Sequence, residues 1–304
     1  ARTTQLIDLS GNVYKSWSLN STNGYSTLLT PDRCLVRSCS NGVQKVSWEG
    51  DVVWTYRISN NHHDICVLPN GNVLITVKVT ATQTGPGGSG GLSYDKIIEV
   101  NGETGQIVWE WRFIDHVGQD TDSSLSNYCV ISENPQLFDA SNRGTNGYND
   151  WIHLNGLDYN PWLDQIVFSA KYLQEIFVID HSTTTTEAAS HSGGKTGKGG
   201  DFLYRYGYPA NYDCGGSAVF GTLHDARWSV GENYLASDNP ASENYHLYAG
   251  CISVWSNTQV SGMVFEPDYG SGYEYNHIPG SAFGPASCSA EIGVSGRSTN
   301  MGSA

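Results

Sequence analysis

The side chains in this sequence that are best suited to chemistry are histidines. The chain has nine of them and few other residues arranged as a nucleophile would be. Four lie at the edges of segments that have the pattern of β-strands, namely His62, His63, His153 and His224. A neutral imidazole is a nucleophile near pH 7, and a second histidine can donate or accept the proton that such a reaction needs. These four histidines are the candidates for a catalytic site.

The surroundings of these histidines predict where they lie in the fold. His62 and His63 precede the hairpin signal at 68–75, and His153 precedes a strand predicted at 164–171. His224 follows a glycine-rich loop. In a β-propeller, equivalent positions on the inner strands of different blades converge on a central channel. Such a fold would bring histidines that are far apart in the sequence to one site.

Composition and a repeated hairpin predict an all-β fold. The chain has 35 Gly, 18 Tyr and 9 Trp but only 2 Met, which is typical of short aromatic strands joined by tight turns. An apolar strand, a glycine-containing turn and a strand with Trp recur at 6–17, 46–54 and 97–111. A second type of hairpin lies between them, at 68–75 and more weakly at 29–35.

This repetition predicts the architecture. Two hairpins in each interval of roughly 40 to 50 residues match the period of a four-stranded propeller blade. A β-sandwich is the alternative, although it does not produce the same hairpin at that period. We expect one β-propeller domain over residues 1–304 with six four-stranded blades. Two glycine-rich or Ser/Thr-rich stretches, near 80–92 and 182–200, are expected to be loop insertions.

Several short motifs together resemble the arylsulfotransferase (aryl-sulfate sulfotransferase) family. The resemblance extends over about residues 1–285, and its motifs stand in the family's order: His62-His63-Asp64 before Leu68-Pro69-Asn70-Gly71-Asn72; Asp150-Trp151-Ile152-His153-Leu154-Asn155 before Tyr159-Asn160-Pro161; Ile179-Asp180-His181-Ser182-Thr183-Thr184; Gly199-Gly200-Asp201-Phe202-Leu203-Tyr204-Arg205-Tyr206-Gly207; and His224-Asp225-Ala226. Each motif is weak alone, and their order makes the resemblance specific.

The resemblance implies a cofactor-independent ping-pong reaction on phenolic sulfate esters and phenols. His224 matches the histidine that carries the sulfuryl group between the two substrates, and His153 and Asn155 match a second motif of the family. In this scheme His153 and His63 transfer protons, while His62 belongs to the substrate-binding residues. Either His62 or His63 could instead be structural.

Two departures from the family pattern bear on activity. The family places Arg in the strand after the His-x-Asn motif, whereas this chain has Lys171. Lysine keeps the positive charge that, together with Asn155, would hold the sulfuryl oxygens, but it lacks the planar two-pronged geometry of arginine. The segment after Ser295-Gly296 also departs from the pattern, so the last blade is expected to be incomplete.

Charge and cysteine spacing exclude several partners. Thirty acidic against 16 basic residues give a formal charge of −14, which disfavours nucleic acid. No apolar run is long enough to span a membrane. The seven cysteines lack paired Cys-x-x-Cys spacing, and the segment at 120–123 lacks the rest of a calcium loop, so no metal is expected. The Asn20-Ser21-Thr22 sequon and the polar composition predict an extracytoplasmic protein, secreted or periplasmic.

A non-catalytic role is the alternative hypothesis. Lys171 and the expected incomplete last blade would suit an extracellular propeller that serves as a structural or ligand-binding module. An unpaired strand edge could then join copies of the chain into a homo-oligomer or a longer assembly.

Overall fold

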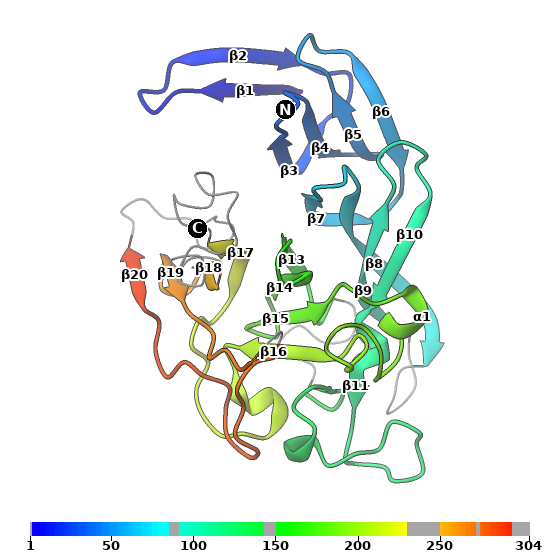
Figure 1. Ribbon diagram of the computed structural model, residues 1–304, viewed down its shortest axis with the longest axis vertical. Coiled ribbons are helices and arrows are strands. Elements are labelled where there is room, and N and C mark those ends of the chain that lie inside the picture. The colour runs from blue at the N-terminus through cyan, green and yellow to red at the C-terminus, as the bar shows by residue number, and fades with distance from the viewer. Residues whose placement is uncertain (1, 85–90, 143–149, 230–249, 272–273, 294–304) are drawn as a thin grey trace. The chain divides into compact units, whose positions relative to one another are not determined.

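The structure is a computed structural model, which describes residues 2–84, 91–142, 150–229, 250–271 and 274–293 (Figure 1). The chain divides into two compact units, one comprising Ala1–Lys78 and Ile97–Trp109, the other Val79–Lys96 and Glu110–Ala304. Each unit is described by itself, and the expectation of a single domain over the whole chain stays a prediction. Among the described residues, no helix is long and apolar enough to cross a membrane.

The N-terminal part of the chain forms a hairpin and two four-stranded sheets. The hairpin pairs β1 (Thr3–Ile7) with β2 (Val13–Ser18). The first sheet has the order β3-β4-β5-β6, with β3 (Asn23–Leu29), β4 (Leu35–Cys39), β5 (Gly42–Val46) and β6 (Val52–Arg57). The second has the order β10-β9-β8-β7, with β7 (Asn61–Val67), β8 (Val73–Thr84), β9 (Gly91–Val100) and β10 (Ile107–Arg112).

The second half begins with a short irregular region and continues with two more four-stranded sheets. The irregular region contains η1 (Phe113–His116), β11 (Val117–Gly118), η2 (Ile131–Glu133) and β12 (Phe138–Asp139). The third sheet consists of β13 (Leu154–Asn160), β14 (Gln165–Ala170), β15 (Glu175–Asp180) and β16 (Phe202–Tyr206), with α1 (Thr185–Ala188) before β16. After η3 (Pro209–Tyr212), the fourth consists of β17 (Leu223–Ser229), β18 (Cys251–Ser256), β19 (Ser261–Phe265) and β20 (Ala290–Gly293).

The same tight turn closes four hairpins of the first unit. In the β1–β2 turn, the Asp8 amide donates to the Asn12 carbonyl and the Gly11 amide donates to the Asp8 carbonyl. The β3–β4, β5–β6 and β7–β8 turns repeat both bonds. In each, the fourth turn residue has a positive φ, which glycine adopts without strain; these residues are Gly11, Arg33, Gly50 and Gly71. The hairpins predicted from the sequence are confirmed.

Neighbouring sheets pack through their first strands. In the first unit β3 contacts β7, and in the second unit β13 contacts β17. Buried Val and Ile side chains fill the space between the sheets of the first unit, and a larger aromatic and aliphatic cluster fills that of the second. Successive antiparallel four-stranded sheets with adjacent first strands are the arrangement of propeller blades. The fold is all-β with a β-propeller arrangement.

The predicted number of blades is wrong. The described residues form four four-stranded sheets, and the remaining strands pair only as β1–β2 and β11–β12. Residues 117–142 do not supply alternating strands, because side chains such as Gln119 and Asp139 hydrogen-bond nearby backbone amides and favour turns instead. The last blade is complete in strand number, since β20 pairs with β19 from Ser261↔Gly293 to Val264↔Ala290.

Of the two expected loop insertions, the structure describes the one at 182–200 in full and the one near 80–92 in part. Strand β8 extends to Thr84 and β9 begins at Gly91, so only 85–90 separates them, and those residues lie outside the described part of the chain. Residues 182–200 are described throughout. They include α1, whose Thr184 and Glu187 form a reciprocal capping box, as the Thr-x-x-Glu pattern favours.

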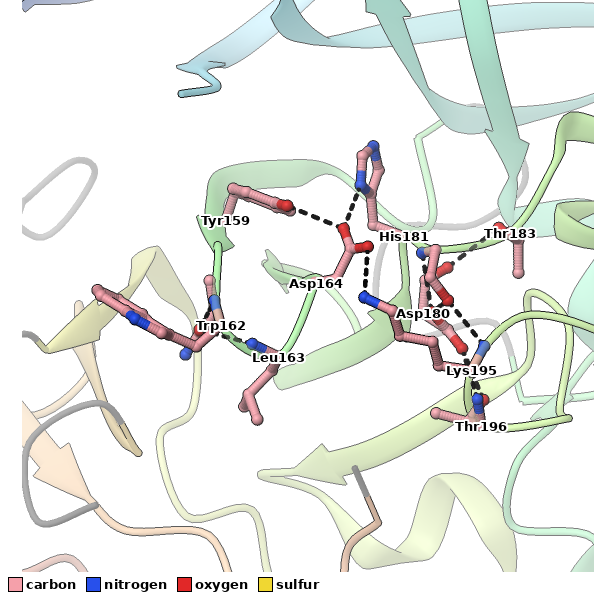
Figure 2. A network of polar contacts seen from close by, with 11 residues as sticks. Tyr159, Trp162, Leu163, Asp164, Asp180, His181, Thr183, Lys195 and Thr196 are labelled. Carbon is pink, nitrogen blue, oxygen red and sulfur yellow. Dashed lines mark hydrogen bonds and ion pairs between the residues drawn. The ribbon is translucent and has the colours of Figure 1, made fainter. Parts of the chain in front are cut away.

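A network of polar contacts fixes this 182–200 segment to the third sheet (Figure 2). Asp164 accepts hydrogen bonds from the Tyr159 hydroxyl at 2.8 Å and His181 Nδ1 at 2.9 Å, and pairs with Lys195 Nζ at 3.0 Å. Asp180 accepts from the backbone amide and the hydroxyl of Thr196, both at 2.9 Å. These bonds hold the segment against the β13–β14 turn and the end of β15.

Replacing Asp164 with Asn is expected to lower stability in a pH-dependent way. The hydrogen bond from His181, then those from Lys195 and Tyr159, hold the pKa of Asp164 well below its ordinary value of 3.8, although burial opposes them. A carboxyl whose pKa is lower in the folded state stabilises the fold above its ordinary pKa and loses that contribution as the pH falls. We expect Asp164→Asn to cost about 1–2 kcal/mol at pH 7, and the difference to narrow below pH 3.8.

Urea denaturation of parent and variant at several pH values measures this effect. The exposed carboxylate of Glu103 provides the matched control, and Glu103→Gln is expected to change stability little at any pH. A loss of stability for Asp164→Asn that stays constant down to pH 3 would contradict a stabilising role of the ionised Asp164 carboxylate.

Candidate functional site

The site is built around His224, which lies in β17 and is buried. Its Nδ1 is 2.5 Å from Oδ1 of Asn257, the residue that follows β18. A carboxamide oxygen only accepts hydrogen bonds, so Nδ1 carries the proton and the lone pair of the neutral ring lies on Nε2. The Asn257 amide donates to the Thr222 carbonyl at 2.8 Å, which fixes the backbone next to this contact. The tautomer of His224 is therefore set by Asn257.

The surroundings of His224 also favour its neutral form. Burial lowers the pKa of His224 from its ordinary value of 6.5, and the hydrogen bond to Asn257 opposes this shift. The nearby positive charge of Lys171, and that of His153 when protonated, lower the pKa of His224 further. A histidine with a lowered pKa is deprotonated at neutral pH, as a nucleophile must be.

Each candidate histidine lies near an irregularity in the first strand of its sheet. The strand register shifts between Asn61 and Ile65 in β7, between Leu154 and Gly156 in β13, and between His224 and Arg227 in β17. His63, His153 and Asp225 adopt positive φ at these places, and His and Asp are among the residues that tolerate it best. Such bulges redirect side chains and are common next to active sites.

Asn155 joins β13 to β17. Its Nδ2 donates to the Leu223 carbonyl at 2.8 Å, and its Oδ1 accepts from the Ser169 hydroxyl at 2.8 Å. The two strands approach so closely that a Cβ on Gly156 would lie 2.5 Å from the Ala226 amide nitrogen. Asn155 thus positions the backbone immediately before His224, and the second N–H of its amide is not used in this contact.

His153 is paired with a carboxylate. Its Nδ1 lies 2.6 Å from Oδ2 of Asp150, so Nδ1 carries a proton and Nε2 is the atom that can exchange one with a substrate. The ring packs edge-on against Tyr172 with 4.9 Å between the centroids. A histidine oriented by a carboxylate is suited to act alternately as a general acid and a general base.

Lys171 follows β14 and is anchored to the same region. Its backbone amide donates to the His153 carbonyl at 3.1 Å, and its Nζ lies 5.4 Å from the centre of the Tyr172 ring. Within the described residues, Lys171 forms no ion pair with a carboxylate. It is therefore a cation near His224 whose charge is available to an anionic ligand.

The other charged residues of the His-Asp-Ala segment stabilise the strand. Arg227 donates through both Nε and Nη2 to Asp225 Oδ1, each at 2.7 Å, and through Nη1 to the Leu157 carbonyl at 2.6 Å. This fork links β17 to β13 and holds the bulge that carries His224. Asp225 is accordingly a positioning residue.

His62 and His63 lie in β7, and both make contacts within the first unit. Their ring centroids are 4.3 Å apart with 72° between the ring planes, and the centroid of the Tyr25 ring lies 4.8 Å from that of His63. The Thr76 hydroxyl hydrogen-bonds the His62 carbonyl. Their assignment to proton transfer and substrate binding stays a prediction.

The structure thus groups part of the predicted set. His153, Asn155, Lys171 and His224 belong to the second unit, and the charges of Lys171 and His153 act on His224. Sequence reasoning missed Asn257, because it follows an ordinary hairpin strand and belongs to no motif. Its Nδ2 is buried and has no hydrogen-bond partner among the described residues, so it is a further donor at this site.

Solved structures offer only distant likenesses. A protein of unknown function from Bacteroides caccae has a TM-score of 0.48 at 10% identity, with 96% of this chain and 69% of that chain covered. The hydrazine synthase of Kuenenia stuttgartiensis has a TM-score of 0.49 at 11% identity, with 88% of this chain and 65% of that chain covered. The Dos1 propeller has a TM-score of 0.38 at 10% identity, with 93% of this chain and 64% of that chain covered. The chain thus spans about two thirds of the length of these structures.

No curated protein matches the chain, whereas one protein family does. The match to that family extends over residues 2–189, which is more than half of the chain. It includes His62, His63, His153, Asn155 and Lys171 and ends before His224. On this match, the chain belongs to the arylsulfotransferase (ASST) family.

Proposed function

We propose that this protein transfers a sulfuryl group from an aryl sulfate ester to a phenol, with His224 as the residue that carries the group. The observation that supports this most is the hydrogen bond between His224 Nδ1 and Asn257 Oδ1, because it leaves the nucleophilic lone pair on Nε2 of a buried, neutral imidazole. Membership of the arylsulfotransferase family supports the substrate class.

The first half of the reaction uses His224 as a nucleophile. Nε2 donates its lone pair to the sulfur of the aryl sulfate, and the bond between sulfur and the phenolic oxygen breaks. The phenolate leaves with the electron pair and takes a proton from protonated His153. The sulfurylated ring keeps its Nδ1 proton, so the Asn257 carboxamide oxygen continues to accept a hydrogen bond as positive charge develops on the imidazole.

The second half reverses these steps with a different phenol. His153, now neutral, accepts the phenolic proton, and the phenol oxygen attacks the sulfur. The bond between sulfur and Nε2 breaks, and the electron pair returns to His224. Asp150 accepts a hydrogen bond from His153 Nδ1 in both protonation states, which keeps Nε2 as the exchanging atom.

Lys171 and two amides would hold the sulfuryl oxygens. Those oxygens carry negative charge throughout, and Lys171 forms no competing ion pair within the described residues. The spare N–H groups of Asn155 and Asn257 are fixed donors in the same buried region. A lysine contacts an anion as a point charge, so these amides would supply part of the directionality that a family arginine provides.

Sulfate transfer from 4-nitrophenyl sulfate to a second phenol tests the proposal directly. Release of 4-nitrophenolate should depend on the acceptor, and double-reciprocal plots at several acceptor concentrations should be parallel, as a ping-pong reaction requires. Absence of acceptor-dependent release over a panel of phenols, with a folded protein, would overturn the proposed function.

Lys171→Met is expected to reduce transfer and to change its pH dependence. Removal of one charged contact to the sulfuryl group should lower kcat/KM by about 10²-fold. Because the charge of Lys171 lowers the pKa of His224, its removal should also move the acid limb of the pH–rate profile to higher pH. The steady-state rate between pH 5 and pH 8 measures both effects.

Lys171→Arg is the matched control, since it keeps the positive charge. Its acid limb should stay at the position of the parent protein, and its rate should equal or exceed that of Lys171→Met at every pH. A Lys171→Met profile identical to that of the parent in height and position would exclude Lys171 from the site.

A further inference from the structure

A second group of potentially reactive side chains lies apart from the residues used above. It consists of His116 at the end of η1, His191 in the segment after α1, and Asp201 immediately before β16. His116 Nδ1 lies 2.8 Å and His191 Nδ1 2.7 Å from the same oxygen, Oδ1 of Asp201. One potential ligand atom from each residue lies within 4.8 Å of the others.

The hydrogen bonds of His116 place two acceptors opposite each other when its ring is neutral. Its Nε2 lies 2.9 Å from the Ala188 carbonyl oxygen, which only accepts, so Nε2 carries a proton. In the neutral ring, the Nδ1 lone pair then points at the Asp201 carboxylate, which is also an acceptor. His116 Nδ1 and Asp201 Oδ1 lie 2.8 Å apart, and two acceptors at this distance require either an extra proton or a metal ion between them.

His116 has the surroundings of a preorganised metal ligand. Its side chain is fully buried and its ring stacks on Trp111, with 5.3 Å between centroids and 2° between planes. Trp111 Nε1 donates to the Gly200 carbonyl at 2.8 Å, and a Cβ on Gly200 would lie 2.7 Å from His116 Nε2. A metal-binding histidine usually donates its other N–H to a carbonyl or carboxylate, as His116 does to Ala188.

The segment that carries His191 is also held in place. The contacts of Lys195 with Asp164 and of Thr196 with Asp180 fix it from one side (Figure 2). The Gly200 amide donates to the Ser190 carbonyl at 3.0 Å next to His191 itself. Only the His191 ring extends into solvent, with 61% of the side chain exposed.

We propose that His116, His191 and Asp201 bind a divalent transition-metal ion of the zinc class. Two imidazole nitrogens and one carboxylate oxygen suit Zn²⁺, Co²⁺ or Fe²⁺, whereas Ca²⁺ and Mg²⁺ prefer sets made mostly of oxygen. Ligands around a tetrahedral zinc ion lie about 3.3 Å apart, so binding requires a small opening of the present contacts. The exposed His191 ring can make that movement.

The metal would keep a coordination position open to a pocket. His191 and Asp201 line a cavity of about 430 Å³, whose wall also includes Glu133, Lys198, Tyr275 and His277. Three protein ligands with a remaining position for water or a substrate group are typical of catalytic zinc rather than of structural zinc, which is held by four. A small ligand with an anionic or carbonyl oxygen is the class that could reach this position.

No sequence motif marks this group of residues. The three residues come from separate segments and show no metal-binding spacing, so the expectation that no metal binds rested on the cysteines and one acidic loop. The proposal does not depend on sulfuryl transfer, and its test uses binding rather than activity.

Zinc titration of the chelator-treated full chain tests the site. The probe is Zn²⁺ alone, measured by calorimetry on the parent protein, His191→Ala and His277→Ala. His191 is exposed, so its replacement should not affect folding. His277→Ala is the matched control, because it removes a histidine from the same pocket without touching the three ligands. The parent and His277→Ala should bind one equivalent that His191→Ala binds about a hundredfold more weakly or not at all.

Two further readouts identify the ligands. Zinc should raise the unfolding temperature of the parent and of His277→Ala more than that of His191→Ala. The Co²⁺ form should show d–d absorption without a thiolate charge-transfer band, since the proposed ligands contain no sulfur. Equal zinc binding by all three proteins, or loss of binding in His277→Ala, would overturn the proposal, and the group would then be a proton-bridged contact.

Discussion

His224→Ala is expected to abolish acceptor-dependent transfer from 4-nitrophenyl sulfate. The variant lacks the only group in the proposed mechanism that bonds to sulfur, and neither Lys171 nor Asn155 can replace it. Loss of a nucleophile that acts together with other catalytic groups typically lowers kcat by 10⁴-fold or more, which is about the effect expected here. Initial rates at saturating donor and acceptor measure it.

The control must separate loss of chemistry from loss of fold. His224 is buried and its removal takes away the donor that Asn257 Oδ1 contacts, so a stability loss on the order of 1–2 kcal/mol is expected. Rates are therefore compared well below the unfolding temperature of the variant. His277→Ala should retain the parent rate, because His277 lies outside the proposed machinery. A folded His224→Ala protein with more than a tenth of the parent rate would exclude His224 as the nucleophile.

Arg205→Met is expected to lower the free energy of unfolding more than Asp164→Asn or His224→Ala does. Arg205 in β16 pairs with Glu175 in β15 through two contacts, Nε to Oε1 at 3.1 Å and Nη2 to Oε2 at 2.5 Å, and both side chains are fully buried. Removal of one partner leaves the other charge buried and uncompensated, which costs about 3–5 kcal/mol. Denaturant unfolding of parent and variant measures the difference.

The remaining contacts of this pair cannot compensate for the loss of Arg205. Asn211 Nδ2 donates to Glu175 Oε2 at 2.8 Å but carries no charge. Arg205 Nη1 also bonds the carbonyls of Pro135 and Leu137, which would lose a donor. Because β15 and β16 belong to the sheet that carries Asn155, the effect should extend to the candidate site.

The pH dependence of the stability of Arg205→Met tests whether the buried charge of Glu175 causes the loss. Burial raises the pKa of Glu175 above its ordinary value of 4.5, while Arg205 and Asn211 oppose that shift. Without Arg205, the pKa of Glu175 rises further, so the folded variant binds a proton more readily than the unfolded chain. Its stability should therefore increase as the pH falls toward 4.5.

A double variant completes the test. Arg205→Met with Glu175→Gln removes both charges and should be more stable at pH 7 than Arg205→Met alone. The same stability loss at all pH values, without recovery in the double variant, would contradict the account of a buried uncompensated charge.

Local sequence signals predicted the hairpins well because each turn depends on one or two residues. The glycines at 11, 50 and 71 have the positive φ that such turns require, and their flanking strands follow the alternating pattern. The count of blades failed for a different reason. It extrapolated a period through residues 113–142, where polar side chains such as Gln119 bond to nearby backbone and the named strands that the structure describes are the short pair β11 and β12.

The candidate site was predicted only where a motif marked it. His153, Asn155, Lys171 and His224 were identified through family motifs, and the structure places all four in the second unit. Asn257 could not be found, because its contact with His224 depends on the register of β17 with β18. The same holds for His116 and Asp201, which lie 85 positions apart and meet only in the folded chain.

Trapping of the covalent intermediate is the most direct test of His224 as the residue that carries the sulfuryl group. The protein is mixed with 4-nitrophenyl sulfate without an acceptor, quenched at alkaline pH to preserve a sulfurylated imidazole, and digested for mass spectrometry. We expect one added sulfuryl group on the peptide that contains His224, its disappearance when a phenol is added before the quench, and its absence in His224→Ala. A sulfuryl group on another residue that turns over with the phenol, or donor turnover with His224 unmodified, would contradict this role of His224.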